Sequence, residues 1–597
     1  MRLTGGQIVT RALLGMGIPW IAGIPGHGCL PLVDAFYEER NRLPLYLVRH
    51  EQSAAHMADG YYRVSGKPAA VFTSIGPGAM NLAVGLGTAY VDSTAMLALI
   101  GETHSYMAGR GVLQEIERVR PADSLRVLEP LSKYAQHAAR VEQLPTALRR
   151  AFTAIRTERA GPAVIALPMD VQAETAELEE SVFSYRSPEP GRPCSSDISR
   201  AAAMITEAKR PLIIAGGGAL RSGASTVLVK LAETVQAAVI TTMAGKSAFP
   251  EDHPLYAWHA GSKGTGCGNR LAAAADLILA VGCRFADETT SSYRRGVSYN
   301  IPPTKLIQVD IDQAEIGKNY PIETAITGDA RLALEALLEE LEPAKNKMAK
   351  LSYREEIETA RNNWQAELEA FRSGDKVPIT VSGALREIRA ALPRDGYLVT
   401  SSGHSQAQVL QEFPFYEPGT LVTTGGFSTM GFAFPAALGV KLARPENTVV
   451  ALAGDGDFLM TAQELATAAQ YGLDVIAIIL NNSGFLSIRD LQTDVYGEAR
   501  QYATEFTTRQ GEESGTDFKA LAAAFNVAGE TVSRPGEVQA ALERAIRAGG
   551  PRLVEVKVNR RYPWSGGRAA GWWDLPVPEY LEEKRAAYEK ARSEIQA

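Results

Sequence analysis

The sequence predicts an α/β protein built from three doubly wound parallel sheets, each flanked by helices. Short apolar runs such as AAVFTSI at 69–75 and TAMLALIGE at 94–102 alternate with amphipathic helical stretches, which is the pattern of parallel strands joined by crossover helices. The chain has 597 residues, which is too long for one hydrophobic core, so domains of roughly 150 to 200 residues are expected.

The first series of strands and helices occupies residues 1–180 and includes GPAVIALPMD as a further strand. The segment SYRSPEPGRPCSSD at 184–197 is rich in Pro, Ser and Gly, which indicates a linker. A second series at 190–342 contains the apolar runs RPLIIAGGG, QAAVITTMAG, ADLILAVGCRF and KLIQVDID. The charged stretch at 343–375 has helical composition and is interpreted as a helical linker.

The third series, at 376–562, contains YLVTSSG, NTVVALAGDGD, VIAIILNN and RLVEVKV as expected strands. Residues 563–597 form a tail in which an aromatic cluster with Trp572 and Trp573 precedes a charged helix.

The composition excludes several classes of protein. A net charge of -7 without a basic block argues against a nucleic-acid partner. Cys29, Cys194, Cys267 and Cys283 form no CxxC, so neither a disulfide framework nor a zinc site is expected, and a reducing cytoplasm fits. The chain shows no signal-peptide pattern and no apolar run of 18 residues, so we expect no membrane span.

The stretch GDGDFLMTAQELATAAQYGLDVIAIILNN at 454–482 carries the strongest functional signal. NTVVALA and DVIAIIL are expected to be neighbouring parallel strands joined by a helix over 461–471 that ends at Gly472. Asp455 and Asn482 then follow the carboxyl ends of both strands, where open α/β sheets bind ligands. Such oxygen ligands suit Mg²⁺, and the glycines allow backbone N–H groups to approach an anion.

Other glycine-rich motifs are weaker. AGKS at 244–247 ends like a phosphate-binding loop, but Ile240 occupies the position of its first glycine. GPGAMN at 76–81 and GGGALR at 216–221 both lack the third glycine of a dinucleotide fingerprint.

Together with RHEQSAAHMADGYYR at 49–63, TSIGPGAMN at 73–81 and GGFSTMGFAFPAALG at 425–439, the GDG…NN unit resembles the thiamine-diphosphate (ThDP) enzymes of the acetolactate synthase type. The resemblance spans nearly the whole chain. It implies a pyrimidine-binding domain, a middle domain and a diphosphate-binding domain, in that order. It also implies that Asp455, Asn482 and the carbonyl of Gly484 hold Mg²⁺.

The same resemblance implies the contacts of the cofactor. Glu51 matches the carboxyl group that hydrogen-bonds the aminopyrimidine ring and assists removal of the C2 proton, and Met430 matches the apolar residue that props the cofactor in a bent shape. His404 and Ser405 match positions that touch the diphosphate. The further cofactor-binding positions it implies are Pro77, Asn81, Gly403, Ser428, Gly454, Gly456, Asp457 and Phe485.

The substrate signals differ from those of acetolactate synthase. PGHG at 25–28 places His27 where that family has glycine, and Leu491 replaces its tryptophan. With VLQEIE at 112–117 and the tail tryptophans, these features resemble the trihydroxycyclohexane-1,2-dione hydrolase of inositol catabolism. The favoured expectation is hydrolysis of a cyclic 1,2-diketone, with His27 and Gln114 beside Glu51 as catalytic candidates. Arg489 is either a substrate contact or an ordinary salt-bridged residue.

Three alternatives remain: an acetolactate synthase-like decarboxylase and carboligase, a 2-hydroxyacyl-CoA lyase, and a non-enzymatic ThDP-binding sensor or scaffold. The partner implied is a small carbonyl compound. Because the family forms its site between two subunits, the resemblance implies a dimer at minimum and a tetramer as a common form. Arg284-Phe285 and VDIDQAEIGKN at 309–319 leave room for FAD in the middle domain.

Overall fold

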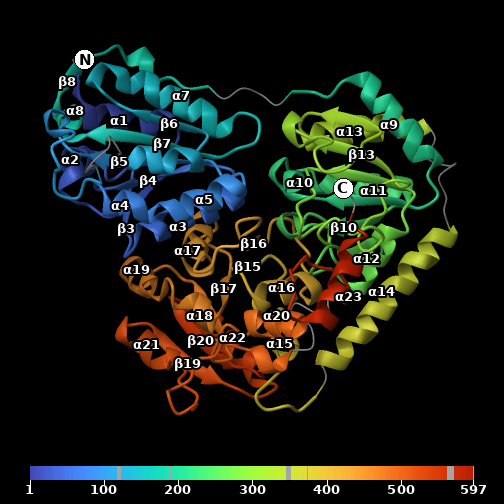
Figure 1. Cartoon of the computed structure of the whole chain (residues 1–597). Helices are drawn as coiled ribbons and strands as arrows, with labels where there is room; N and C mark the ends of the chain where they lie inside the picture. The colour runs from blue at the N-terminus through green and yellow to red at the C-terminus, as the bar shows by residue number, and fades with distance from the viewer. Residues whose placement is uncertain (117–122, 187–190, 344–350, 373, 561–569, 596–597) are drawn as a thin grey trace.

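The computed structural model describes residues 1–116, 123–186, 191–343, 351–372, 374–560 and 570–595. These residues form three six-stranded parallel sheets with helices on their faces. Figure 1 shows the three sheet regions as separate groups, blue for the first, green for the second and orange for the third. The expected α/β fold with three sheet domains is therefore confirmed.

The first sheet has the strand order β3-β2-β4-β5-β7-β6. Its strands are β2 (Ile21–Gly23), β3 (Leu45–Leu47), β4 (Ala69–Thr73), β5 (Met96–Glu102), β6 (Tyr134–His137) and β7 (Pro162–Pro168). Its helices are α1 (Gly5–Gly15), α2 (Leu30–Glu38), α3 (Glu51–Ser65), α4 (Pro77–Asn81), α5 (Ala83–Val91), α6 (Ser124–Leu128), α7 (Leu144–Arg156) and α8 (Met169–Ala173). A separate antiparallel pair, β1 (Arg2–Thr4) and β8 (Thr175–Glu177), joins the two ends of this region.

The second sheet has the order β11-β10-β9-β12-β13-β14. Its strands are β9 (Pro211–Ala215), β10 (Ala238–Thr241), β11 (Tyr256–His259), β12 (Leu277–Val281), β13 (Lys305–Asp310) and β14 (Thr324–Thr327). The helices around it are α9 (Ser195–Glu207), α10 (Gly217–Arg221), α11 (Ser225–Val235), α12 (Gly266–Ala273) and α13 (Ala330–Leu341), and the long helix α14 (Leu351–Arg372) leads to the third sheet.

The third sheet has the order β16-β15-β17-β18-β20-β19. Its strands are β15 (Tyr397–Thr400), β16 (Leu421–Thr423), β17 (Val449–Gly454), β18 (Ile476–Asn481), β19 (Ala528–Val532) and β20 (Arg552–Lys557). Its helices are α15 (Val381–Ala391), α16 (His404–Glu412), α17 (Ala433–Ala443), α18 (Asp455–Phe458), α19 (Leu465–Tyr471), α20 (Leu486–Tyr496), α21 (Phe518–Ala524) and α22 (Glu537–Ala548). In the tail, α23 (Glu582–Arg592) returns beside the second sheet region (Figure 1).

In each sheet the connections leave two central neighbouring strands in opposite directions, and this central reversal determines where ligands can bind. In a parallel sheet the helices on the two sides of the reversal lie on opposite faces, which leaves a crevice at the carboxyl ends of the two strands. The reversals lie between β2 and β4, between β9 and β12, and between β15 and β17. The loops that follow these six strands are therefore the candidate ligand-binding segments.

The first and third domains share one hydrophobic core through α3 and α17. Glycines make this close packing possible. A Cβ atom added at Gly60 would lie 2.1 Å from the Ala436 carbonyl oxygen, and one at Gly439 would lie 1.9 Å from the Met57 carbonyl oxygen. The two helices thus pack backbone against backbone, and they fix the orientation of the first sheet relative to the third.

One local expectation is wrong in detail. Instead of a continuous helix over 461–471, the chain forms a 3₁₀ turn at Ala462–Glu464 followed by α19. The Thr461 hydroxyl donates to the Gly431 carbonyl at 2.9 Å, and this bond holds Thr461 out of helical geometry. The predicted end is confirmed, since Gly472 caps α19 in the left-handed conformation with φ of 61°.

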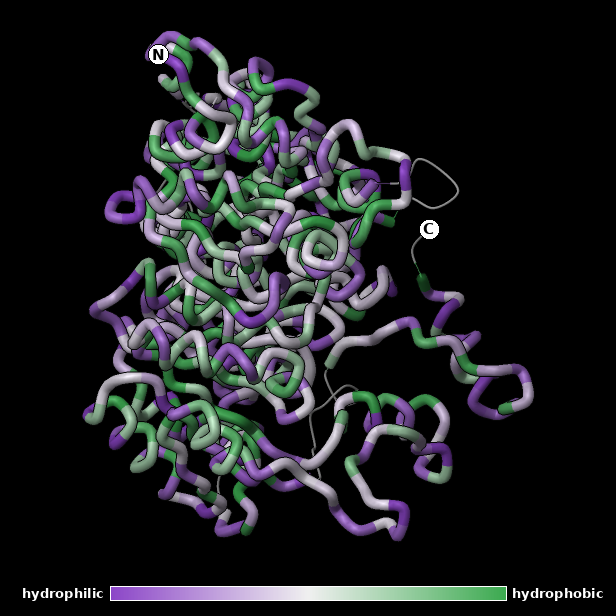
Figure 2. The backbone as a smooth tube through the Cα atoms, turned by 90° about the vertical axis from the view of Figure 1, so that its left-hand side faces the viewer, coloured by the Kyte–Doolittle hydropathy of each residue, from purple (hydrophilic) through white to green (hydrophobic). Residues whose placement is uncertain are grey.

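Hydrophobic and hydrophilic stretches alternate along the whole backbone (Figure 2). Within the described ranges, no helix is long and apolar enough to cross a membrane.

Candidate active site

The two ends of the GDG…NN unit meet in the third sheet. Asp455 follows β17 directly, and its carboxylate is buried. One carboxylate oxygen accepts from the Gly456 N–H at 2.9 Å, and the other accepts from the Gly484 N–H at 3.0 Å. Burial raises the pKa of Asp455, because it disfavours the charged carboxylate. A cation bound nearby would stabilise that charged form. The expected convergence of the two loops is therefore present.

The two asparagines have different surroundings. Asn481 faces the sheet, where its Nδ2 donates to Glu555 at 2.6 Å and its Oδ1 accepts from the Ser483 N–H at 3.1 Å. In contrast, Oδ1 of Asn482 is buried and has no hydrogen-bond partner among the residues that the structure describes. A buried polar oxygen without a partner is costly, so Asn482 has the character of a ligand and Asn481 that of a structural residue.

These groups fit a magnesium and diphosphate site. Asp455 and Asn482 provide oxygens, and around Gly454 and Gly403 there is open space where a side chain would otherwise stand. No group of three or more His, Cys, Asp or Glu that could hold a metal occurs in the described part of the chain. A single carboxylate suits Mg²⁺ when phosphate, amide and water oxygens complete its shell.

His404 and Ser405 begin α16, on the other side of the reversal from Asp455. Both are buried, and His404 Nε2 lies 3.6 Å from Asp490 Oδ2. Burial, with the positive charges of Arg489 and Lys263, lowers the pKa of His404 to about 3. The imidazole is therefore neutral at pH 7 and can offer one N–H to an anion.

Met430 is half-buried on a loop that Asp457 holds in place. The Asp457 carboxylate accepts from the Gly431 N–H at 2.6 Å, and its other oxygen is buried without a hydrogen-bond partner in the described part of the chain. Burial raises the pKa of Asp457 to about 7. Ser428 lies on the same loop in the left-handed region, with φ of 51°, and its hydroxyl is 2.9 Å from that of Ser402.

Phe485, the remaining predicted position in this sheet, stands against the GDG turn. A Cβ atom at Gly456 would lie 2.4 Å from its ring, so glycine is needed there. The ring also packs edge-on against Phe506 at 5.1 Å between centroids.

Glu51 lies at the first turn of α3 and is 7% exposed. Its Oε2 accepts from Asn81 Nδ2 at 2.9 Å, and a Cβ atom at Gly78 would lie 3.0 Å from its Oε1. Asn81 and Pro77 belong to α4, which follows β4. The reversal point of the first sheet thus holds the carboxyl group, with Asn81 as its hydrogen-bond donor.

His27 and Gln114 reach the same edge. His27 is exposed on a loop whose neighbouring Gly28 donates its N–H to Ser74 Oγ at 3.2 Å. Gln114 is exposed with φ of 71°, and its carbonyl oxygen lies where a side chain at Gly76 would need to stand. Glu51, Asn81, His27 and Gln114 therefore form one group on the first sheet.

Arg489 is engaged by protein groups. It contacts Asp490 at 2.9 Å and Glu505 at 3.3 Å, and it donates to the Arg560 carbonyl at 2.6 Å. Of the two interpretations left open by the sequence, these contacts favour a salt-bridged structural residue.

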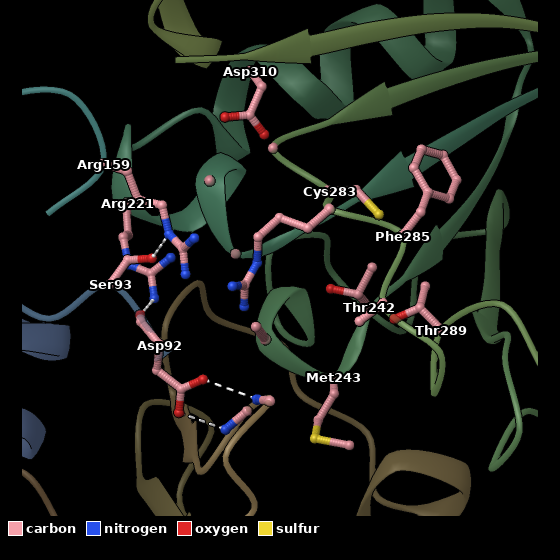
Figure 3. Close-up of a pocket in the computed structure, with 18 of the residues that line it drawn as sticks. Asp92, Ser93, Arg159, Arg221, Thr242, Met243, Cys283, Phe285, Thr289 and Asp310 are labelled. Atoms are coloured by element: carbon pink, nitrogen blue, oxygen red, sulfur yellow. Dashed lines mark hydrogen bonds between the residues drawn. The ribbon is translucent and has the colours of Figure 1, made fainter. Parts of the chain in front are cut away.

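A cavity of about 470 Å³ lies at the reversal point of the second sheet, and Figure 3 shows part of its lining. Gly217 and Gly218 border it after β9, and Gly282 and Arg284 border it after β12. The loops touch so closely that a Cβ atom at Gly218 would lie 2.7 Å from Gly282 Cα. The second sheet has the strand order of dinucleotide-binding folds, which place their ligands here.

Arginines dominate one side of this cavity. Arg159 is held by Ser93 Oγ at 2.6 Å and Glu315 at 3.1 Å, whereas Arg221 donates to the Asp92 carbonyl (Figure 3). Burial and the charge of Arg63 lower the pKa of Arg221 to about 10. The guanidinium of Arg284 makes no hydrogen bond or ion pair within the described ranges. The cluster therefore has positive charge to offer to an anion.

Asp310, at the carboxyl end of β13, provides the acidic group of the same cavity, and burial raises its pKa to about 6. The sequence named Arg284 and the segment VDIDQAEIGKN, which contains Asp310, for this cavity, and it gave GGGALR, which ends in Arg221, only as a weak glycine-rich motif. Arg159 was missed, because it comes from the first domain and only the fold brings it to the cavity.

Comparisons with known proteins agree with this geometry. The N-terminal TPP binding domain of thiamine pyrophosphate enzymes matches residues 3–120, the central domain matches 198–337, and the C-terminal TPP binding domain matches 401–556. Thiamine pyrophosphate is ThDP. The matches include the sheet reversals that carry Glu51 and Asp455.

Similar proteins cover almost the whole chain. A probable acetolactate synthase large subunit of Methanocaldococcus jannaschii is 35% identical over 93% of this chain and 92% of its own length. The acetolactate synthase large subunit of Haemophilus influenzae is 34% identical over 94% of both chains. A probable 2-ketoarginine decarboxylase of Pseudomonas aeruginosa is 35% identical over 93% of this chain and 94% of its own length. With its three sheets, its GDG…NN unit and these relatives, the chain belongs to the thiamine pyrophosphate enzymes.

Proposed function

We propose that the protein is a ThDP- and Mg²⁺-dependent enzyme that removes CO₂ from a 2-oxo acid and joins the remaining fragment to a second carbonyl compound. The observation that carries this proposal is the contact between Asp455 and Gly484 beside the unpartnered oxygen of Asn482. The named activities of the relatives support the acid substrate, since they are acetolactate synthases and a probable 2-ketoarginine decarboxylase.

In this proposal Asp455, Asn482 and the Gly484 carbonyl hold Mg²⁺, which neutralises the diphosphate of the cofactor. His404, neutral at pH 7, and Ser405 offer hydrogen bonds to phosphate oxygens from the start of α16. When bound, ThDP supplies a carbon nucleophile that adds to the substrate carbonyl.

Glu51 has the protein's main proton-handling role. With ThDP bound, its carboxyl group would hydrogen-bond the pyrimidine ring nitrogen and so favour loss of the proton at C2 of the cofactor. Asn81 keeps Glu51 in place through the 2.9 Å bond. Asp457 fixes the loop of Met430, whose side chain would support the bound cofactor. Gln114 and His27 stand where the substrate would enter.

We propose that Glu51 of one subunit faces Asp455 of another. The contacts of Glu51 are with Asn81 and Gly78, and those of Asp455 are with Gly456 and Gly484, so the two lie in separate groups of the chain. A large apolar side chain is exposed to solvent next to each group. Leu113, beside Gln114, is 79% exposed, and Met460, after the GDG turn, is 49% exposed. A dimer would cover them, and a tetramer is the expected larger form.

Paired variants test this arrangement. Glu51→Gln and Asp455→Ala subunits, each inactive alone, are co-expressed with different affinity tags, and the doubly tagged dimer is isolated. If sites are shared between subunits, one of the two sites is intact, and hydrogen exchange at C2 of ThDP returns to about half the wild-type rate. If each site lies within one subunit, every site carries a defect and no exchange returns.

A second candidate reaction is the hydrolysis of a cyclic 1,2-diketone, which the sequence analysis favoured. The relatives support the decarboxylase and carboligase more strongly. The observation in favour of the hydrolase is the exposed imidazole of His27 at the edge of the Glu51 group, where it could donate to a developing alkoxide. A product assay by NMR with pyruvate, pyruvate plus an aldehyde, and a cyclic diketone separates the two.

We also propose that the cavity of the second sheet binds FAD. Arg284 and Arg221 would face the diphosphate, and Asp310 the ribose hydroxyls, which acidic groups at strand ends bind in dinucleotide folds. Flavin absorbance near 450 nm in the purified protein would support this. The four cysteines are free, which supports a reducing compartment such as the cytoplasm.

A further inference from the structure

The C-terminal tail contributes a wall to the cavity of the second sheet. Trp573 lines this cavity, although it lies more than 240 residues beyond Ala330, the last lining residue of the second domain. Its indole N–H donates to Asp287 Oδ2 at 3.3 Å, and the side chain is 38% exposed. A large aromatic side chain that is open to a cavity is available to pack against a ligand.

The tail is fixed to the second domain on both sides of Trp573. Before it, the tail backbone lies directly on Gly261, because a Cβ atom at Gly571 would be 2.0 Å from the Gly261 carbonyl oxygen. After it, the Asp574 N–H donates to Ser292 Oγ at 3.0 Å. These contacts place the indole at a defined position relative to the cavity rather than leaving it on a free tail.

A second set of contacts holds the rest of the tail. The guanidinium of Arg294 lies 5.4 Å above the Trp572 ring and contacts the Glu594 carboxylate at 2.6 Å. The Tyr588 hydroxyl of α23 donates to Asp574 at 2.6 Å. The described tail, residues 570–595, is therefore anchored from end to end.

The acidic, basic and aromatic groups that line the cavity lie at different places around it. Figure 3 shows Asp310 at the top, Arg159 and Arg221 on the left, and Thr289 toward the lower right. Trp573 joins the Thr289 side, because its partner Asp287 lies two residues from Thr289. A dinucleotide with its ribose at Asp310 and its diphosphate at the arginines would extend its second ring toward Trp573.

We propose that Trp573 is a ligand-binding residue that packs against the isoalloxazine ring of FAD, while the adenosine half lies at the Asp310 end. This inference rests on the proposed FAD site and adds which half of the ligand the tail contacts. The edge of the Trp573 ring is fixed by the bond to Asp287, so its face remains available for the flavin.

The test uses the full chain freed of nucleotide and titrated separately with FAD and ADP, with binding followed by calorimetry and by quenching of tryptophan fluorescence. We expect Trp573→Ala to weaken FAD binding about threefold to tenfold, the range for one aromatic stacking contact, and to leave ADP binding within about twofold. Trp573→Phe should retain most of the FAD affinity because it keeps a ring. Tyr580→Ala is the matched control, since Tyr580 is a 70% exposed aromatic residue of the same tail.

The outcomes separate this inference from the site on which it rests. Unchanged FAD binding in Trp573→Ala would overturn the inference while leaving the FAD site intact. Equal losses for FAD and ADP would overturn the placement of the flavin half at the tail. If the wild-type chain binds neither compound, the FAD site itself is wrong, and the inference fails with it.

Discussion

Replacing Asn482 and Asn481 by alanine, one at a time, tests the different roles that the structure gives to these neighbours. Asn482 Oδ1 has no protein hydrogen bond to lose, so Asn482→Ala should leave the stability of the cofactor-free protein within about 0.5 kcal/mol of wild type. The same change removes a proposed metal ligand. We therefore expect ThDP affinity in the presence of Mg²⁺ to fall by roughly tenfold or more.

Asn481→Ala should do the reverse. It removes the 2.6 Å bond to Glu555 and the 3.1 Å bond to Ser483, and the Glu555 carboxylate is only 1% exposed. At about 1 kcal/mol for the neutral bond and about 1.5–3 kcal/mol for the bond to the charged group, the loss is roughly 2.5–4 kcal/mol of unfolding free energy.

The assay combines urea unfolding of the cofactor-free protein with calorimetric titration of ThDP at fixed Mg²⁺. We expect Asn482→Ala to change only the titration and Asn481→Ala mainly to change the unfolding curve. Loss of stability in Asn482→Ala, with unchanged ThDP affinity, would refute the assignment of Asn482 as the ligand.

Three further changes test other parts of the site. Glu51→Gln should keep ThDP bound but slow C2 deuterium exchange, followed by NMR, by roughly 10²-fold; wild-type exchange would remove Glu51 from its role. His27→Ala should suppress opening of a cyclic diketone by roughly 10²-fold while decarboxylation of pyruvate persists; if both or neither change, His27 is structural. Burial, with the charges of Arg63 and His50, lowers the pKa of His56 to about 3. As the pH falls below about 6.5, His56 therefore takes up a proton in the unfolded state but not in the folded state. Acidification from pH 7 to pH 5 should thus lower the free energy of unfolding by about 2 kcal/mol. His56→Gln should flatten this part of the curve in thermal unfolding at pH 7 and 5, whereas an unchanged slope would exclude His56 as its cause.

The sequence predicted the buried central strands well and the edge strands poorly. The apolar runs that were expected as strands correspond to β4, β5, β7, β9, β10, β12, β13, β15, β17, β18 and β20. Those that were not identified include β3, β6, β11, β14, β16 and β19, which are the outermost strands of the three sheets. The buried central strand β2 was also missed, because its three residues are too short to form a recognisable apolar run. Edge strands are short and several are half-exposed, as in β3 and β6, so they lack the continuous apolar run that marks a strand buried on both faces.

In the candidate site, the sequence could not predict contacts between residues that only the fold brings together. The contact between Asp455 and Gly484 follows from two adjacent parallel strands, and it could be foreseen from their spacing. The difference between Asn481 and Asn482 depends on which side chain faces Glu555, and no pattern in the sequence carries that. The cavity around Arg159, Arg221 and Asp310 combines distant segments, and Trp573 reaches it from the tail.

The most direct test of the proposed function is decarboxylation by the purified protein with defined cofactors. The protein is supplied with ThDP, Mg²⁺ and FAD, and ¹³C-labelled pyruvate, alone or with an aldehyde, is followed by NMR. We expect release of labelled CO₂ and a new 2-hydroxy ketone product, both lost when ThDP is omitted and both reduced in Asn482→Ala. Ring opening of a cyclic 1,2-diketone without any CO₂ release from pyruvate or other 2-oxo acids would contradict it.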